Sequence, residues 1–183
     1  MKITFSALGL ALAAALAGPS AFANTGTINF EGKITSSTCP IEVVNPGDGA
    51  IGNQVKMGSV DASRFTGIGQ EYSGKTFVLR LNDKGNCNLT GTHDVARVTF
   101  NGVGDSSGKY FGITPGNDGA KGVAIVIKDH TGTLVPPGAP SAKYPLITNS
   151  VNDMVFNAYY RSTATTVTAG TASADVQFVV AVN

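Results

Sequence analysis

Two segments of the chain match motifs that carry chemistry in other proteins. Gly69–Thr76 fits G-x-x-x-x-G-K-T, a loop that cradles phosphate groups when a helix begins at its lysine. The residues that follow, Phe77-Val78-Leu79-Arg80-Leu81, alternate as a strand does, so no such helix is expected. Gly104–Gly108 fits G-x-S-x-G, which needs a strand before its serine and a helix after it, but another turn follows here. We predict that neither motif is functional and that the protein is not an enzyme.

Other candidates for catalysis or ligand binding are few. His93 and His130 each have a neighbouring aspartate, so a triad with a serine is formally possible, but we favour surface turns over a catalytic site. The two histidines lack ligand spacing with Cys, Asp or Glu. We predict no catalytic residues, no metal site and no cofactor. Tyr159-Tyr160 could stack on a sugar, although alternation along a strand would turn only one of the two rings inward.

The first residues have the pattern of an export signal. Lys2 precedes the apolar stretch Ile3–Ala17, and Ala21-Phe22-Ala23 is an A-x-A cleavage site. We predict that residues 1–23 are removed and that the mature chain begins at Asn24. Without Lys2, 12 basic residues face 12 acidic ones, and charged residues make up only 14% of the sequence. Such a balance offers no basic surface for nucleic acid.

The chain has two cysteines, Cys39 and Cys87. In an exported protein an even pair indicates a disulfide, with two free buried thiols as the alternative. The bond would close a loop of nearly fifty residues, for which a chain-entropy model gives about 4 kcal/mol of stabilisation.

Short alternating segments between turn-forming clusters predict an all-β fold with no helix after the signal. Roughly seven strands at this spacing favour an Ig-like sandwich. The predicted strands are 28–34, 54–60 (the weakest), 76–81, 95–100, 123–128, 154–161 and 175–183. Residues rich in Gly, Pro, Asn and Asp separate many of them, as at Pro46–Gly49 and Pro115–Gly119.

The segment Gly26–Ile34 lies close to the predicted mature N-terminus. It alternates cleanly and places Ile28, Phe30 and Ile34 on one face. An apolar strand of this kind either joins its own sheet or pairs with another chain, because an exposed one promotes aggregation.

Several segments, in the same order along the chain, resemble segments of the chaperone–usher pilins, in particular the type 1 major-pilin group. G-T-I-N-F-E-G-K-I-T-S-S-T-C is similar to the family's donor segment and first cysteine. Phe77–Leu81 before Cys87, and Met154–Tyr160, are similar to two of its later strands. The C-terminus resembles its chaperone-recognition pattern, with Gly170 fourteenth from the end and then an alternating strand, although Val182 stands where the family usually has an aromatic residue.

The resemblance implies an incomplete Ig-like sandwich, the pilin fold, in residues 36–183, with a donor-strand extension in residues 24–35. The donor-strand residues would be Gly26, Ile28, Phe30, Gly32 and Ile34. The acceptor groove and the chaperone-recognition surface would use Gly170, Val176, Phe178, Val180 and Val182.

The same resemblance implies a structural subunit of a surface fimbria, exported through the periplasm and polymerised by strand exchange. Its partners would be identical or related pilin subunits, a periplasmic chaperone and an outer-membrane usher, and the assembled fibre could meet a host or surface receptor. A minor or adaptor subunit, or a carbohydrate-binding tip protein, is the alternative.

Overall fold

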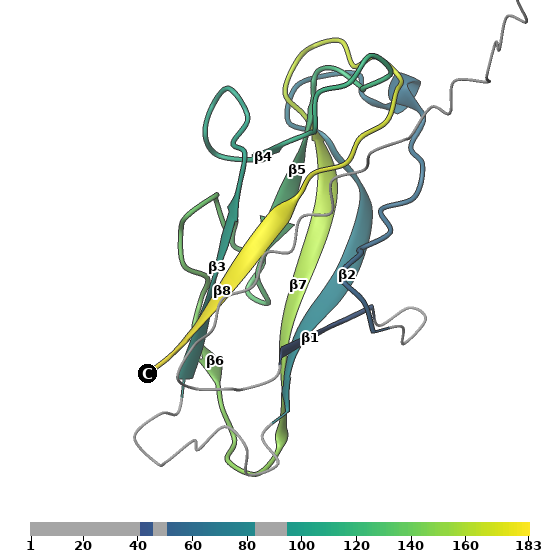
Figure 1. The fold of residues 1–183 in the computed structure, drawn as a ribbon. Helices are drawn as coiled ribbons and strands as arrows, with labels where there is room; N and C mark the ends of the chain where they lie inside the picture. Colours follow the sequence, from purple (N-terminus) through teal and green to yellow (C-terminus); the bar gives the residue numbers. More distant parts are fainter. Residues whose placement is uncertain (1–40, 46–50, 83–94) are drawn as a thin grey trace, which may run out of the picture. The chain divides into compact units, whose positions relative to one another are not determined.

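The computed structural model describes residues 41–45, 51–82 and 95–183, which are almost entirely β-structure (Figure 1). The helical element among them is one 3-10 turn, η1 (Ala62–Arg64), which starts where the Asp61 side chain accepts a hydrogen bond from the Ser63 amide at 2.9 Å. No helix in these ranges is long and apolar enough to cross a membrane. The donor segment 24–35 and both cysteines, Cys39 and Cys87, lie outside the described residues.

The larger sheet has five antiparallel strands. Its spatial order is β1 (Ile41–Val44), β2 (Glu71–Asn82), β7 (Val151–Ser162), β5 (Val123–Lys128) and β4 (Phe111–Gly112). The long strands β2 and β7 pair from Glu71↔Arg161 to Asn82↔Val151. We call the end where β2 begins the head end and the end where β2 finishes the tail end. Ile41 pairs with Leu81, so β1 starts at the tail end.

The smaller sheet has three antiparallel strands, in the order β6 (Tyr144–Pro145), β3 (Val95–Gly102) and β8 (Val176–Val182). Strand β3 lies between the other two, and it pairs with β8 from Ala96↔Val182 to Gly102↔Val176. Strand β8 therefore begins at the head end and finishes at the tail end (Figure 1).

The core lies between the two sheets, where alternate residues of the long strands point inward. Phe77 and Phe156 stack with ring centroids 5.5 Å apart, and Phe100 from the other sheet meets Phe156 edge-on at 4.9 Å. Tyr144 extends this aromatic group at 5.3 Å from Phe156 and donates a hydrogen bond from its hydroxyl to the Val155 carbonyl. Edge-to-face and offset-stacked rings add to the stability that burial supplies.

A buried carboxylate fixes the turn after β5. Asp129 is 1% exposed and accepts hydrogen bonds from the Thr131 amide, the Thr131 hydroxyl, the Thr133 amide and the Ala142 amide. Burial by itself would raise the pKa of this carboxyl, but these hydrogen bonds outweigh it and hold the pKa below its usual value. Asp129 therefore remains ionised while it ties two loops together.

Most predicted strands that fall on described residues are confirmed, and one is wrong. Strands β2, β3, β5 and β7 contain the segments predicted from alternation, with β2 and β7 longer than expected, and β8 lies within the predicted 175–183, one residue shorter at each end. Residues 54–60 form no strand, and Gly58 there has φ +75°. Two of the backbone carbonyls in this segment, those of Gln54 and Met57, accept hydrogen bonds from the side chains of Asn45 and Ser73 respectively. The short strands β1, β4 and β6 were not predicted, because two to four residues carry no measurable period.

Candidate strand-acceptor site

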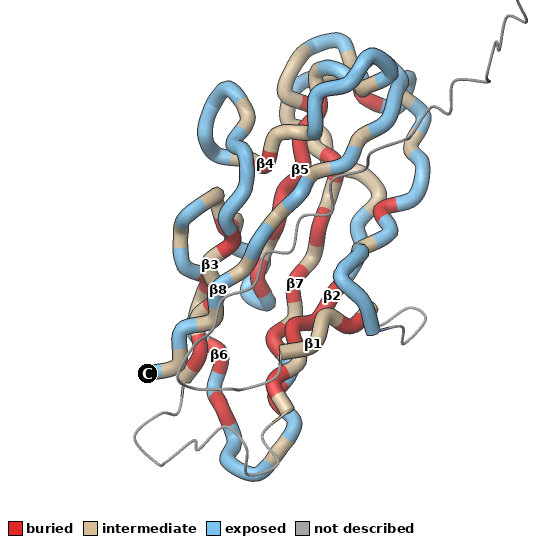
Figure 2. The backbone as a smooth tube through the Cα atoms, in the orientation of Figure 1, coloured by how far each residue is buried: buried red, intermediate tan, exposed pale blue. Residues whose placement is uncertain are grey.

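The last strand of the chain lies at a sheet edge. Within the described ranges β8 pairs only with β3, so its other edge has no strand beside it there. The strand alternates regularly between half-buried and exposed residues (Figure 2). Its half-buried side chains, which we call the acceptor strip, are Val176, Phe178, Val180 and Val182. An apolar row left half-covered along an open edge is suited to pairing with a further strand.

Apolar residues of the other sheet contact the same core cluster and are also half-buried. Ile41 and Val43 come from β1, whose one strand partner among the described residues is β2 and whose other edge bonds only Ile51 and Gly52 there. Val55 and Val60 come from the segment after it. Each sheet thus ends, within the described chain, in a strand whose inward side chains are only partly covered. A strand added beside β8 would bury more of this apolar surface.

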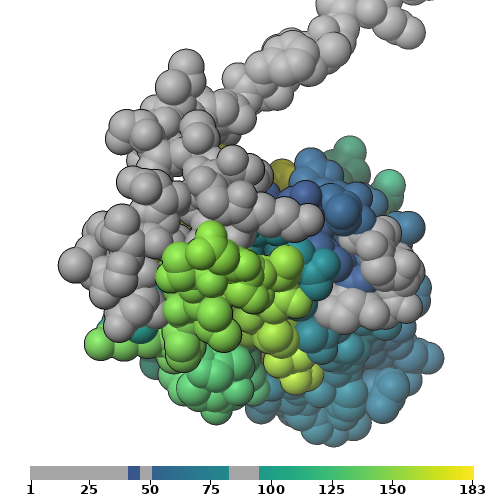
Figure 3. Space-filling view, turned by 90° about the horizontal axis from the view of Figure 1, so that it is seen from below, coloured from purple at the N-terminus to yellow at the C-terminus, as the bar shows by residue number. Residues whose placement is uncertain are grey.

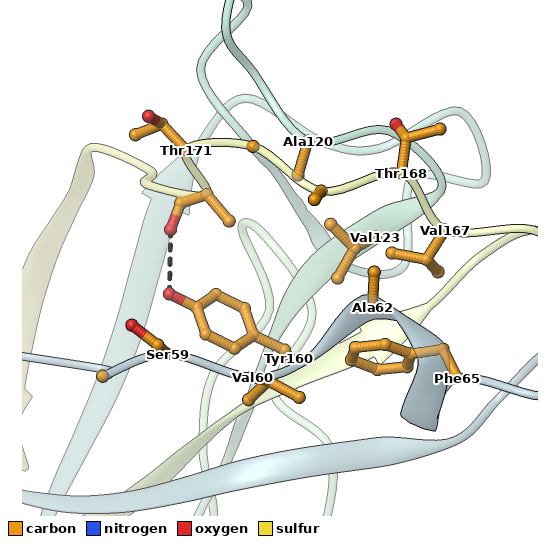
Figure 4. Close-up of a pocket in the computed structure, with 14 residues that line it drawn as sticks. Ser59, Val60, Ala62, Phe65, Ala120, Val123, Tyr160, Val167, Thr168 and Thr171 are labelled. Carbon is orange, nitrogen blue, oxygen red and sulfur yellow. Dashed lines mark hydrogen bonds between the residues drawn. The ribbon is translucent and has the colours of Figure 1, made fainter.

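A pocket of about 410 Å³ lies beyond the start of β8, at the head end (Figure 4). Tyr160 and Val123 come from the larger sheet, whereas Phe65 follows η1 and Ala172 leads into β8. The Tyr160 hydroxyl donates a hydrogen bond of 3.0 Å to the Ala172 carbonyl, which fixes this approach to the strand. The other lining residues are Gly58, Ser59, Val60, Ala62, Ala120, Val167, Thr168, Ala169, Gly170 and Thr171.

The floor of this pocket is built by packing between loops and strands. The Phe65 ring meets Tyr72 edge-on at 5.0 Å, and the Arg64 guanidinium lies 4.6 Å from the centre of the same tyrosine ring. Burial raises the pKa of Tyr160, so its hydroxyl stays protonated and remains a donor. The pocket is mainly apolar and suits an aliphatic side chain.

Gly170 lies at this pocket rather than in β8, which begins six residues later. A Cβ built on Gly170 would stand 2.4 Å from the Ala120 amide nitrogen and 2.6 Å from the Asp118 carbonyl oxygen. The backbone next to Gly170 is hydrogen-bonded to the same loop, because the Thr171 amide donates to the Asp118 carbonyl at 2.7 Å. The immediate role of this glycine is therefore to let two backbone segments approach closely.

The outer face of the larger sheet carries an ion-pair network at the head end. Glu71 accepts hydrogen bonds from Lys128 at 2.6 Å and Arg161 at 2.7 Å. Burial opposes ionisation of Glu71, but the two cations more than compensate and hold its pKa below the usual value. Both cations also face aromatic rings, Lys128 that of Tyr159 and Arg161 that of Tyr110. The network joins β2, β5 and β7 through Glu71, Lys128 and Arg161.

The two motifs singled out first have structural roles. Most of Gly69–Thr76 lies in β2, where a bulge at Ser73 and Gly74 leaves room for the Tyr159 ring. Gly104–Gly108 lies in the hairpin between β3 and β4, whose turn is closed by a bond from the Gly108 amide to the Asp105 carbonyl. Of the adjacent tyrosines, Tyr160 is buried and Tyr159 lies on the outer face, as alternation predicts. Over the residues that the structure describes, no group of three or more His, Cys, Asp or Glu is placed to bind a metal ion.

The sequence pattern predicts which face of β8 is half-buried, but it does not predict the pocket. Val176, Phe178, Val180 and Val182 were chosen from alternation and resemblance, and all four share the half-buried face of β8. The pocket combines Val60, Phe65, Val123 and Tyr160, which are up to a hundred residues apart in sequence. No local pattern in the sequence links residues so far apart. The one available signal is the hydrophobic alternation of 123–128 and 154–161, which indicates that Val123 and Tyr160 face the core.

Comparison with known proteins identifies the family. The family model described as "Fimbrial protein" matches residues 28–183. The chain is 33% identical to the "Probable major fimbrial subunit LpfA" of Escherichia coli O157:H7 over 97% of its length and 94% of the relative's. It is 28% identical to a type I fimbria protein of Burkholderia pseudomallei, with a TM-score of 0.58 over 79% of this chain and 99% of that one. The P pilus rod subunit PapA, at 17% identity and a TM-score of 0.57 over 72% and 93% of the two chains, shares the fold. This chain therefore belongs to the fimbrial protein family.

Proposed function

We propose that the protein is a structural subunit of a chaperone–usher fimbria, and that it polymerises when the N-terminal segment of one subunit pairs with β8 of another. The observation that carries the proposal is the acceptor strip, an apolar row along the edge strand β8. Among the described residues, β8 is paired on the side that faces β3 and on no other. Addition of a strand to such an edge supplies main-chain hydrogen bonds, and alternate side chains supply specificity.

The predicted donor segment has the pattern that this edge requires. Gly26, Ile28, Phe30, Gly32 and Ile34 would share one face of an extended strand. Every strand pair in the two sheets is antiparallel, so we place the donor antiparallel to β8. Because β8 runs from the head end to the tail end, Ile34 would then reach the head-end pocket. Gly32 would let the donor backbone approach the acceptor closely.

The energetics require a complete strand rather than a few anchors. Burial of Ile28, Phe30 and Ile34 would contribute roughly 5–9 kcal/mol, and each ladder hydrogen bond about 0.5–1.5 kcal/mol. Ordering the segment costs about 1–2 kcal/mol per residue, so the apolar anchors alone do not guarantee binding. We infer that the preformed strip and the full ladder together make the exchange favourable.

An apolar edge exposed before assembly would aggregate unless another protein covered it. We therefore assign a periplasmic chaperone to the acceptor strip, which it holds until an outer-membrane usher exchanges it for the donor of the next subunit. The product would be a fimbria on the bacterial surface.

The test compares two substitutions that add the same charge to neighbouring residues of the donor. In cells that express the chain with its chaperone and usher, Phe30→Asp should abolish fibres, because it places a carboxylate on the apolar face. Asn29→Asp puts that charge on the opposite face and should leave fibres in normal yield. Export of both variants is checked by the amount of chaperone-bound subunit. Normal fibre yield from Phe30→Asp would refute the assignment of the donor.

A further inference from the structure

A loop at the tail end exposes two apolar side chains. It runs from Leu146, after β6, to Val151, the first residue of β7, and connects the two sheets; we call it the tail loop. Ile147 is 66% exposed and Val151 is 46% exposed. Figure 3, seen from this end, shows the green residues of the region at the surface. Two exposed aliphatic residues in one short loop at the end of a domain make this loop a candidate contact surface.

The tail loop is held in a fixed conformation by the side chain of Asn152. Asn152 is 6% exposed, accepts a hydrogen bond from the Ile147 amide at 2.7 Å, and donates to the carbonyls of Ile147 and Ser150. Asn149 takes a left-handed conformation, with φ +58°, which asparagine tolerates in turns. A turn fixed in this way loses little conformational freedom when a partner covers Ile147 and Val151.

The course of the chain identifies what lies opposite the tail end in a polymer. In the proposed exchange, the donor of an incoming subunit ends with Ile34 at the head-end pocket of its neighbour. The body of the incoming subunit begins with Ile41, at its own tail end. The seven residue steps from Ile34 to Ile41 span at most about 25 Å. The tail end of one subunit must therefore lie close to the head end of the next.

The head end offers a firm surface of small and polar residues. Segments 115–122 and 163–171, which we call the head platform, are joined by reciprocal backbone bonds between Lys121 and Thr168, at 3.3 and 3.1 Å, and by the Thr163 amide to the Gly122 carbonyl at 2.8 Å. Exposed residues of the platform include Gly116, Ala169 and Gly170, which leave room for larger side chains to approach.

We propose that Ile147 and Val151 of one subunit pack on the head platform of the adjacent copy, forming a second contact beside the exchanged strand. This inference rests on the proposed function. The exchanged strand links the two bodies, and the tail loop sets the angle between them, because a connection of a few residues would otherwise leave that angle free.

Photo-crosslinking in assembled fibres tests the contact directly. A photoreactive residue at position 147 should give crosslinks to 115–122 or 163–171 of a second copy, identified by mass spectrometry of the digested fibres. Position 51 is the matched control, since Ile51 is also 66% exposed but lies against β1, and it should not reach the head platform. Crosslinks from 147 to another surface, their absence in intact fibres, or equal capture from position 51 would overturn the inference.

A pair of double variants tests the consequence for the fibre. Ile147→Ser with Val151→Ser should leave strand exchange intact but shorten the persistence length of the fibres in electron micrographs. Ile51→Ser with Val179→Ser removes side chains of the same exposed fractions, 66% and 46%, from the sides of the domain and should leave the stiffness unchanged. Equal stiffness of the two would overturn the contact while fibre formation still supported the exchange. If the unmodified chain formed no fibres at all, the proposed function would fail and this contact with it.

Discussion

Strands β3 and β8 are neighbours in one sheet and have almost the same sequence pattern, yet they differ in burial. The inward residues of β3 are completely covered, with Ala96 and Val98 at 0% and Phe100 at 3% exposure. Their partners on β8, Val182, Val180 and Phe178, are only half-buried (Figure 2). Strand β3 has a partner on each side, whereas β8 has one within the described chain. Alternation thus identifies the inward face, and position in the sheet decides whether that face is stable or available for pairing.

The largest expected effect concerns β3, the strand that has a partner on each side. Phe100→Ala removes a ring that contacts Phe77 and Phe156. It should lower the free energy of unfolding by about 3–5 kcal/mol. The measurement is denaturant unfolding of the subunit bound to a peptide of residues 24–35. A loss below about 1 kcal/mol would mean that the core does not depend on this ring.

The matching change on β8 should affect binding of the donor segment more than folding of the subunit. Phe178→Ala should weaken binding of the 24–35 peptide about 10- to 150-fold, the factor that corresponds to roughly 1.5–3 kcal/mol of apolar burial. Titration of a subunit lacking its own donor, released from its chaperone, provides the affinity. Val179→Ala changes the adjacent, outward residue and should bind the peptide normally. Equal losses in both variants would contradict the assignment of the acceptor face.

A third prediction separates a structural from a recognition role for Gly170. Gly170→Ala should cost about 1–3 kcal/mol in unfolding free energy, because its Cβ would collide with the backbone at Ala120. The control is Gly116→Ala, whose Cβ would meet nothing within 4 Å and whose φ is not positive. Normal stability together with lost chaperone binding would instead make Gly170 a recognition residue.

The smallest expected effect concerns the stability of the domain in acid, through Asp129 in the turn after β5. The pKa of Asp129 is lower in the folded protein than in the unfolded chain, so its contribution to stability is present above the unfolded value, about 4, and is lost as the pH falls through the folded value. Asp129→Asn should therefore flatten the decrease in unfolding free energy that occurs as the pH falls below about 4. Parallel pH curves for the two proteins would show that this carboxyl does not contribute.

Much of the fold followed from local patterns. Segments 76–81, 95–100, 123–128, 154–161 and 175–183 alternate strongly enough to predict strands, and each lies in or largely overlaps one. Residues 54–60 misled the prediction because a few apolar residues alternated by chance, while Gly58 and side-chain bonds to the backbone favour an irregular path. The predicted roles of the donor segment and of Cys39 and Cys87 stay predictions, since these residues lie outside the described chain.

By itself, the sequence determined which residues of each long strand face inward, because side chains alternate with a period of two whatever the sheet. It also determined that Val176, Phe178, Val180 and Val182 share one face. Only the tertiary structure decided that this face lies at an edge, that a pocket continues it at the head end, and that Ile147 and Val151 stand out at the tail end. Those features depend on which strands become neighbours and on contacts between residues far apart in the chain, which no local period encodes.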